Sequence, residues 1–186
     1  MKLSILYFAS LLSIIIVSCN SVQNTEKVIV DRRLVWEDFK GKVPDNSKYD
    51  SECWFDVKWE YSNLRNINGK AVFDFIDLPY LKSKSWVRPE AINNAYSDTL
   101  LNHEIGHYNI AKVWARELRS KVRNTSFPYY NFDQKIKSLA ENINNKYLAM
   151  EKQYDDETNH SLNRSEQRRW DAKIRYLMNL YLPQKQ

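Results

Sequence analysis

Glycine, cysteine and histidine are all scarce in this chain of 186 residues, which contains three, two and three of them respectively. Three glycines disfavour the phosphate-binding folds that rely on glycine-rich loops. The sequence also lacks internal repeats and low-complexity runs. Hydrophobic residues nevertheless make up 43% of the chain, which is enough for one domain with a core of its own.

The chain also lacks any marked block of charge of one sign. Its formal net charge is +5, but lysines and arginines are mixed with acidic residues along the whole length. This pattern is typical of a solvated surface and not of a nucleic-acid interface. We therefore expect no nucleic-acid partner.

The first residues predict an export signal. Lys2 is followed by an apolar run that reaches Val17, which is too short and too early to be the only transmembrane helix. The run ends in "IVSC", which resembles the lipobox of bacterial lipoproteins. That resemblance implies a signal peptide over residues 1–18, cleavage before Cys19 and a lipid on that cysteine. An ordinary signal peptide followed by a chance cysteine is the alternative.

Lipidation at Cys19 predicts a protein of the cell envelope, anchored in the membrane on the periplasmic face or at the cell surface. Residues 19–30 are polar and predict a tether, and residues 31–186 predict the folded domain. Cys53 is then left without a partner, which excludes a disulfide framework. Because it lies among aromatic residues in "SECWFDVKW", we expect it to act as a small buried hydrophobe.

Two segments have the period of β-strands. Apolar and polar residues alternate over Phe55–Ser62 and Lys70–Tyr80, as in strands with one buried face. The turn signal at Asn66–Gly69 predicts that they pair as an antiparallel hairpin with a loop longer than two residues.

The period then becomes helical. We expect helices over Ser97–Val122, from Asp133 to about Tyr154, and after Asn163, with a loop over Asp155–Asn163. Asn163 is a good N-cap, and Glu166 three residues later completes a capping box. Strands followed by helices predict an α+β fold with a small antiparallel sheet and about three helices.

The first helix carries two of the three histidines. His103 and His107 are four residues apart, so both imidazoles lie on one face and can bind one zinc ion. Glu104 can reach a water beside that zinc and act as the catalytic base in the H-E-x-x-H pattern. A bound zinc lowers the pKa of water and polarises a scissile carbonyl. Gly106 inside this helix suggests a close approach of backbone or substrate.

A catalytic zinc usually has three protein ligands, so one more is needed. The extension that metzincins carry would require glycine and histidine at positions 110 and 113, which are Ile110 and Val113. His160 is the one histidine left, and we expect it to be the third ligand. Four carboxylates remain as alternatives: Glu141, Asp155, Asp156 and Glu157.

Two neighbours of His160 have possible supporting roles. Asp155 could orient the His160 imidazole through a hydrogen bond, although a solvated acidic loop would look the same. Tyr154 could donate a hydrogen bond to the oxyanion that forms during hydrolysis.

Four stretches resemble a family of bacterial proteins of uncharacterised function that are described as predicted secreted zinc-dependent proteases. These stretches are "LVWEDFKGKVP", "SWV", "LLNHEIGHYNIAKVWARELR" and "YDDETNHSLNRSEQRRW". The resemblance implies a zincin-like fold and peptidase activity, and it places His160 in a matching stretch.

The sequence therefore predicts zinc-dependent hydrolysis of peptide bonds in the bacterial cell envelope, with one Zn²⁺ per chain. The expected partners are a peptide or protein substrate and the membrane, which is reached through the lipid on Cys19. Two alternatives remain. One is a non-catalytic lipoprotein with a structural zinc or a sheet edge that binds a partner. The other is a zinc amidase that acts on peptidoglycan peptides.

Overall fold

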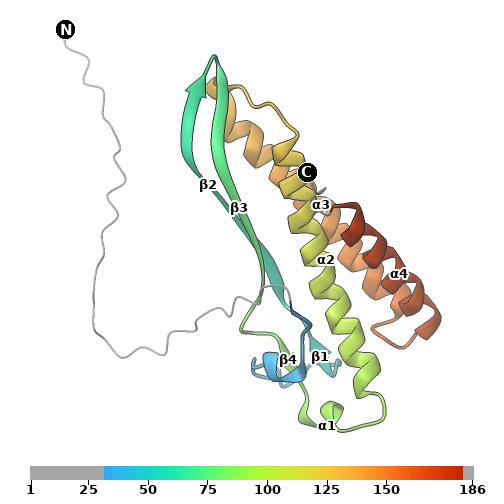
Figure 1. Cartoon of the computed structure of the whole chain (residues 1–186). Coiled ribbons are helices and arrows are strands. Elements are labelled where there is room, and N and C mark those ends of the chain that lie inside the picture. The colour runs from blue at the N-terminus through green and yellow to red at the C-terminus, as the bar shows by residue number, and fades with distance from the viewer. Residues whose placement is uncertain (1–31, 182–186) are drawn as a thin grey trace, which may run out of the picture.

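A long β-hairpin lies beside three long helices in the computed structural model, which describes residues 32–181 (Figure 1). The order of elements, strands first and helices after them, makes the fold α+β as expected. The predicted signal peptide, the lipidation site at Cys19 and the tether all lie outside the described residues. Among the residues described, no helix is both long and apolar enough to cross a membrane.

The hairpin consists of β2 (Phe55–Ile67) and β3 (Lys70–Leu81), which pair antiparallel. The expected longer loop is wrong, because only Asn68 and Gly69 connect the strands. Both residues have positive φ, 52° and 79°, which is the conformation that a two-residue hairpin turn needs. The register shifts between Ser62 and Arg65, where Asn63 also has positive φ. This irregularity let β2 continue five residues beyond the predicted end.

A second, very small sheet lies at the opposite end of the hairpin from this turn. It pairs β1 (Ser51–Glu52) antiparallel with β4 (Trp86–Val87). The 3-10 helix η1 (Trp36–Asp38) and the short helix α1 (Pro89–Ile92) belong to the same end (Figure 1). Together these elements surround the first turns of the next helix.

Helix α2 (Ser97–Arg123) runs through the centre of the structure. Its 27 residues span roughly 40 Å. The 3-10 helix η2 (Tyr129–Asn131) leads into α3 (Phe132–Thr158), which lies beside α2, and α4 (Arg164–Leu180) packs against both. The predicted N-cap of α4 is confirmed, since the Asn163 side chain accepts a hydrogen bond from the Glu166 N–H. The other half of the expected capping box does not form, because the Asn163 N–H donates to the Thr158 carbonyl and the Glu166 carboxylate pairs with Arg169.

Helix α3 ends later than its sequence suggested. The prediction of a loop from Asp155 is wrong, because the helix continues to Thr158 and ends at Asn159 in the left-handed conformation. Tyr154 and Thr158 are both fully buried and continue the apolar face by one turn. Because Thr158 is polar, the pattern of hydrophobic residues did not predict this last turn. The acidic residues 155–157 are therefore helical.

The larger hydrophobic core lies between α2, α3, α4 and the inner face of the hairpin. Ile110, Leu118 and Ile136 are completely buried within it. A smaller core, around Leu34, Leu100 and Tyr108, lies under η1 and the small sheet. Each fully buried side chain of this kind contributes roughly 1.5–3 kcal/mol relative to an exposed one. The smaller core packs around the first turns of α2 and the larger core around the rest of that helix, so α2 is held along its length.

Candidate metal centre

His103 and His107 lie on one face of α2, as predicted, and both side chains are buried. Their Nε2 atoms are 3.2 Å apart. The two rings are nearly perpendicular, with centroids 4.7 Å apart, so the nitrogens converge on one point. One turn of helix is sufficient to produce this pairing.

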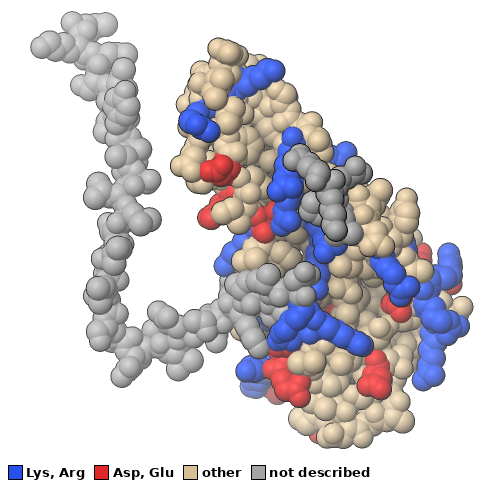
Figure 2. All heavy atoms as spheres, in the orientation of Figure 1, with Lys and Arg blue, Asp and Glu red and all other residues tan. Residues whose placement is uncertain are grey.

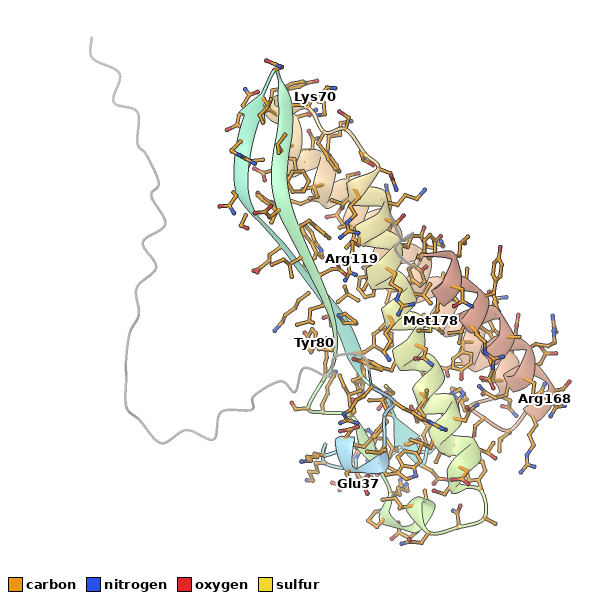
Figure 3. The ribbon with its side chains drawn as sticks, in the orientation of Figure 1. Glu37, Lys70, Tyr80, Arg119, Arg168 and Met178 are labelled. Carbon is orange, nitrogen blue, oxygen red and sulfur yellow. The ribbon has the colours of Figure 1, made fainter. Side chains whose placement is uncertain are left out.

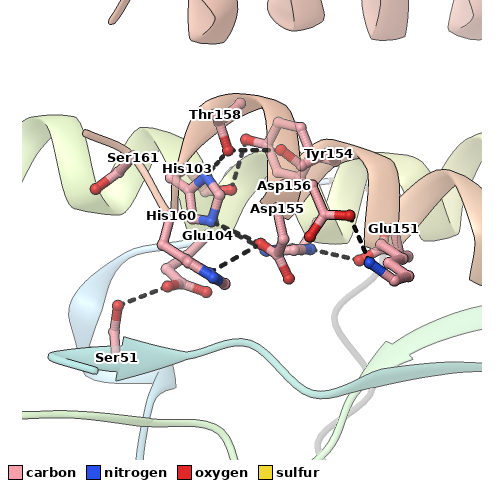
Figure 4. Close-up of polar contacts among 12 residues, drawn as sticks. Ser51, His103, Glu104, Glu151, Tyr154, Asp155, Asp156, Thr158, His160 and Ser161 are labelled. Carbon is pink, nitrogen blue, oxygen red and sulfur yellow. Dashed lines mark hydrogen bonds and ion pairs between the residues drawn. The ribbon is translucent and has the colours of Figure 1, made fainter. Parts of the chain in front are cut away.

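The third converging group is Asp155, which comes from the last turns of α3 (Figure 4). Its Oδ1 lies 3.2 Å from His103 Nε2 and 3.0 Å from His107 Nε2. Ligand atoms around a tetrahedral zinc are separated by roughly 3.3 Å, since each lies about 2.0–2.2 Å from the metal. The spacing of these three atoms therefore fits a small divalent cation that prefers nitrogen and oxygen.

Hydrogen bonds on the far side of both rings determine which nitrogen carries the proton. His107 Nδ1–H donates to Glu151, and His103 Nδ1–H donates to Gln167 Oε1 at 3.2 Å. Each Nε2 is left with its lone pair directed at Asp155. The buried Asp155 Oδ1 receives no hydrogen bond. In these neutral tautomers three lone pairs face one another, and either a proton shared with Asp155 or a cation between the three atoms removes their repulsion, so the arrangement fits a metal.

Gln167 in α4 is itself fixed in orientation. Its Nε2 donates to Tyr154 Oη at 2.7 Å and to Asp171 Oδ1 at 2.9 Å, so its carbonyl oxygen is the atom left to face His103. The Asp171 carboxylate can only accept hydrogen bonds, so the NH2 group of the Gln167 amide must face it. The tautomer of His103 is thus set by a chain of contacts that begins on the third long helix.

The electrostatics of the site favour positive charge. Burial alone would lower the pKa of His107, but the carboxylates of Glu151 and Asp155 outweigh burial and raise that pKa well above its usual value. Burial alone would raise the pKa of Asp155, but the two imidazoles outweigh it and lower that pKa. Burial raises the pKa of Glu151, against the effect of His107. A bound cation would take over the charge that these groups otherwise share.

Glu104 lies beside the three converging atoms and is not one of them. Its side chain is buried, and its Oε1 accepts a hydrogen bond from Ser51 Oγ at 2.6 Å. Its other oxygen, Oε2, is buried and has no donor. Ser51 belongs to β1, so the small sheet holds the carboxylate from the side opposite α3 (Figure 4). One oxygen is anchored and the other is free to accept a proton.

Gly106 is needed for the approach of α3 to α2. A Cβ atom at this position would lie 2.0 Å from Tyr154 Oη and 2.6 Å from its Cζ. The expected close approach is therefore real, and the group that approaches is an aromatic side chain. The Tyr154 hydroxyl donates to the His103 carbonyl oxygen at 3.0 Å and accepts from Gln167. Because the hydroxyl is fully buried and already engaged in these two contacts, the geometry disfavours the expected oxyanion role.

His160 lies at the edge of the site and not among the three converging atoms. It follows α3 in a turn where Asn159, His160 and Ser161 all have positive φ. Its ring packs on Tyr49 with centroids 4.5 Å apart, and its Nδ1 is 3.4 Å from Asp155 Oδ1. The structure thus brings Asp155, and not His160, together with the two histidines, and His160 contacts Asp155 from outside.

The other carboxylate alternatives face away from the two histidines. Asp156 pairs with Lys152 on the exposed side of α3, and Glu157 accepts a hydrogen bond from Trp170 Nε1. Glu141 lies about four turns before Asp155 on the same helix. Glu151 was not predicted from the sequence, although its spacing of four residues from Asp155 could have suggested a shared face. Gln167 and Ser51 were not predicted either, because the sequence carries no signal for them.

A cleft of about 1020 Å³ opens onto these residues. His103, Glu104, His107 and Asp155 line it together with Cys53, which is partly buried and packs against the smaller hydrophobic core. Burial raises the pKa of the Cys53 thiol well above its usual value, and this disfavours a nucleophilic thiolate. Exposed apolar side chains at the rim, Trp54, Leu148 and Leu162, give the cleft surfaces that suit a peptide.

Fold and site together define an α+β domain in which two helices bring a His-His-Asp cluster beside a buried glutamate. Residues 37–161 match the model of a family described as bacterial protein of unknown function (DUF922), and the chain belongs to that family. The match extends from η1 to the turn that holds His160, so it includes all three converging residues and Glu104. Searches of curated proteins and of solved structures gave no match.

Proposed function

We propose that this protein is a zinc-dependent peptidase of the bacterial cell envelope. The observation that carries the proposal is the triangle of His103 Nε2, His107 Nε2 and Asp155 Oδ1, with separations of 3.0–3.2 Å, beside a glutamate oxygen without a donor. A hairpin next to a helix with the H-E-x-x-H pattern also suits a zincin-like fold.

Three features favour a catalytic zinc over a structural one. The described residues supply three converging ligand atoms, and structural zinc sites usually have four protein ligands. The site opens onto a cleft and is not sealed inside the core. Glu104 is buried beside the ligands without joining them, and a purely structural zinc would not need it.

The protein side chains have separate tasks in this proposal. When bound, zinc supplies Lewis-acid chemistry that activates water and polarises the scissile carbonyl. Glu104 accepts the proton of the attacking water on Oε2 and passes it to the leaving amine. Ser51 keeps the other oxygen of Glu104 in place. Glu151 and Gln167 hold the histidine rings in the tautomer that leaves both Nε2 lone pairs available.

The proposed location rests on the N-terminal sequence. A lipid on Cys19 would anchor the chain in the membrane and leave the domain on the periplasmic face or at the cell surface. Both hydrophobic cores consist of described residues, so a chain that begins at Asn20 keeps the whole fold and can be purified without the lipid.

The experiment measures bound metal and hydrolysis in that soluble chain. We expect about one zinc per chain by elemental analysis, and cleavage of casein that a chelator abolishes and zinc restores. Purified peptidoglycan is the second substrate, because cleavage of its peptides alone would identify the amidase. Bound zinc without hydrolysis of either substrate would leave the non-catalytic lipoprotein, and a chain without zinc would refute the metal site.

A further inference from the structure

The end of the molecule farthest from the cleft carries an excess of positive charge. It is built from the hairpin tip, residues 64–73, and from the segment that joins α2 to α3, residues 120–137. We call these two segments the distal end. They contain six lysines or arginines and one acidic residue, whereas the rest of residues 32–181 has nineteen basic and twenty acidic residues. The net positive charge of the described domain therefore comes entirely from the distal end.

The basic side chains of the distal end are exposed. They are Arg65, Lys70, Lys121, Arg123, Lys135 and Lys137. None of these six forms an ion pair with any residue in the described part of the chain, whereas other basic residues such as Arg88, Arg119 and Lys146 do. The single acid, Asp133, accepts a hydrogen bond from Tyr61. Figure 2 shows basic side chains at this end, with uncharged surface between them.

Large apolar side chains are exposed among these charges. Tyr130 is 85% exposed, Ile67 46%, Tyr129 40% and Val72 36%. Isolated exposed apolar residues are common, but these four belong to two neighbouring segments within one basic surface. Tyrosines between lysines and arginines are typical of protein surfaces that rest in the headgroup layer of a membrane.

The two segments form one rigid surface. The Ala71 N–H donates to the Phe127 carbonyl at 2.9 Å, and the Tyr129 N–H donates to the Gly69 carbonyl at 2.9 Å. Below them the rings of Phe73, Phe127 and Phe132 pack with centroids 4.6–5.8 Å apart. The charged and aromatic groups are therefore held in fixed positions relative to one another, which lowers the entropic cost of binding.

We propose that the distal end binds the surface of a membrane that contains anionic lipids. The six basic side chains would lie against the headgroups, and Tyr130 and Ile67 would enter the interfacial layer. Nucleic acid fits less well, because the apolar side chains would then face a phosphate backbone. This inference does not rest on the proposed peptidase activity.

The dimensions of the chain allow this contact. The carbonyl of Arg32, the first described residue, accepts a hydrogen bond from Lys112 Nζ, about 17 Å along α2 from the end of that helix. Twelve residues separate Cys19 from Arg32, and a chain of that length reaches at most about 40 Å. A lipid on Cys19 and the distal end can thus contact the same bilayer. His107 would remain about 24 Å along α2 from Arg123, with the cleft held away from the membrane.

The test uses the soluble chain that begins at Asn20 and two kinds of lipid vesicle. One kind contains phosphatidylcholine alone, and the other contains phosphatidylglycerol in addition. We expect sedimentation with the second kind only, and weaker binding at about 0.5 M salt because exposed charges are then screened. Equal binding to both kinds of vesicle, or no binding to either, would overturn the proposal.

Matched variants locate the surface. Replacement of Lys70, Lys121 and Lys135 by glutamine removes one charge from the hairpin tip and two from residues 120–137, and should weaken binding by about a hundredfold, or about fivefold for each charge. The control replaces three exposed basic residues outside the distal end, Lys42, Arg164 and Arg168, and should change binding by less than about tenfold. Figure 3 shows Lys70 and Arg168 at opposite ends of the molecule. Similar losses in both triple variants would contradict a defined surface.

A last variant distinguishes binding to a membrane from binding to a soluble polyanion. Tyr130→Ser keeps every charge, and the side chain is too exposed for its loss to unfold the protein. It should weaken vesicle binding by about fivefold. If Tyr130→Ser binds vesicles normally and heparin competes as well as vesicles do, the surface recognises a polyanion and the membrane proposal is wrong.

Discussion

The candidate metal centre and the distal end use polar groups in opposite ways. At the candidate metal centre the histidines and Glu104 are buried, and a neighbouring residue orients each of them through a hydrogen bond. At the distal end six charged side chains are exposed without ion pairs in the described chain. Chemistry needs atoms fixed within fractions of an ångström, so burial and hydrogen bonds are required. Binding to a fluid surface needs only charge and apolar area in roughly the right place.

The largest expected effect would show that hydrolysis at the candidate metal centre and membrane binding at the distal end are independent. We predict that Glu104→Gln lowers kcat by roughly 10²–10⁴ because the amide cannot accept the proton. The variant should keep its zinc and its binding to anionic vesicles. Elemental analysis, casein hydrolysis and vesicle sedimentation measure the three properties. Glu141→Gln on the exposed side of α3 is the control, and turnover close to normal in Glu104→Gln would refute the role of the base.

The next prediction decides the third ligand. We expect Asp155→Ala to weaken zinc binding by more than about a hundredfold, since one of three ligand atoms is lost. His160→Ala should weaken it by less than about tenfold, because His160 contacts Asp155 from outside. Competition with a zinc chelator measures both affinities, with Asp156→Ala as the control. A greater loss in His160→Ala than in Asp155→Ala would restore the expectation from sequence.

The contact between α2 and α3 can be broken without touching a ligand. Gly106→Ala places a methyl group against the Tyr154 ring and should reduce the free energy of unfolding by roughly 1–3 kcal/mol. Zinc should also bind more weakly, since Asp155 follows Tyr154 on the displaced helix. Adding Tyr154→Phe removes the closest atom, the hydroxyl, and should recover part of the loss in urea unfolding. An unchanged Gly106→Ala variant would show that the helices can separate freely.

The smallest expected effect concerns the pH dependence of stability. It arises at Glu117, which lies on α2 between the histidines and the distal end. Burial alone would raise the pKa of Glu117, but hydrogen bonds from Lys146 and Tyr147 outweigh burial and lower it. A lowered pKa in the folded state adds stability above the unfolded value of about 4.5, and this stability is lost as the pH falls further. At pH 7 the free energy of unfolding of the wild type should exceed that of Glu117→Gln by about 1 kcal/mol.

Urea unfolding of both proteins at pH 7 and at about pH 3.5 tests this prediction. The difference between the two proteins should shrink at the lower pH, because the carboxyl group is then largely protonated in the unfolded state and the charged form stabilises the fold less. If the difference in the free energy of unfolding grew at low pH, the folded state would not lower the pKa of Glu117 and the prediction would be wrong.

Much of the local structure was predictable from short-range patterns. The alternation in β2 and β3, the helical spacing of α2 and the Asn163 cap depend on neighbours within a few residues. The pairing of His103 with His107 belongs to the same class, because one helical turn alone brings both rings to one face. The hairpin loop was mispredicted, although Asn68 and Gly69 are a known signal for a two-residue turn.

The sequence by itself thus determined the helix with its two histidines and the glutamate between them. Only the tertiary structure decided the third converging group. Packing of Tyr154 against Gly106 extends α3 by one turn and directs Asp155, not His160, at the histidines. The same holds for the distal end, where charge that is evenly mixed along the chain becomes concentrated. Residues 64–73 and 120–137 meet there because backbone hydrogen bonds and packed phenylalanines join residues about sixty positions apart, a contact that no local pattern encodes.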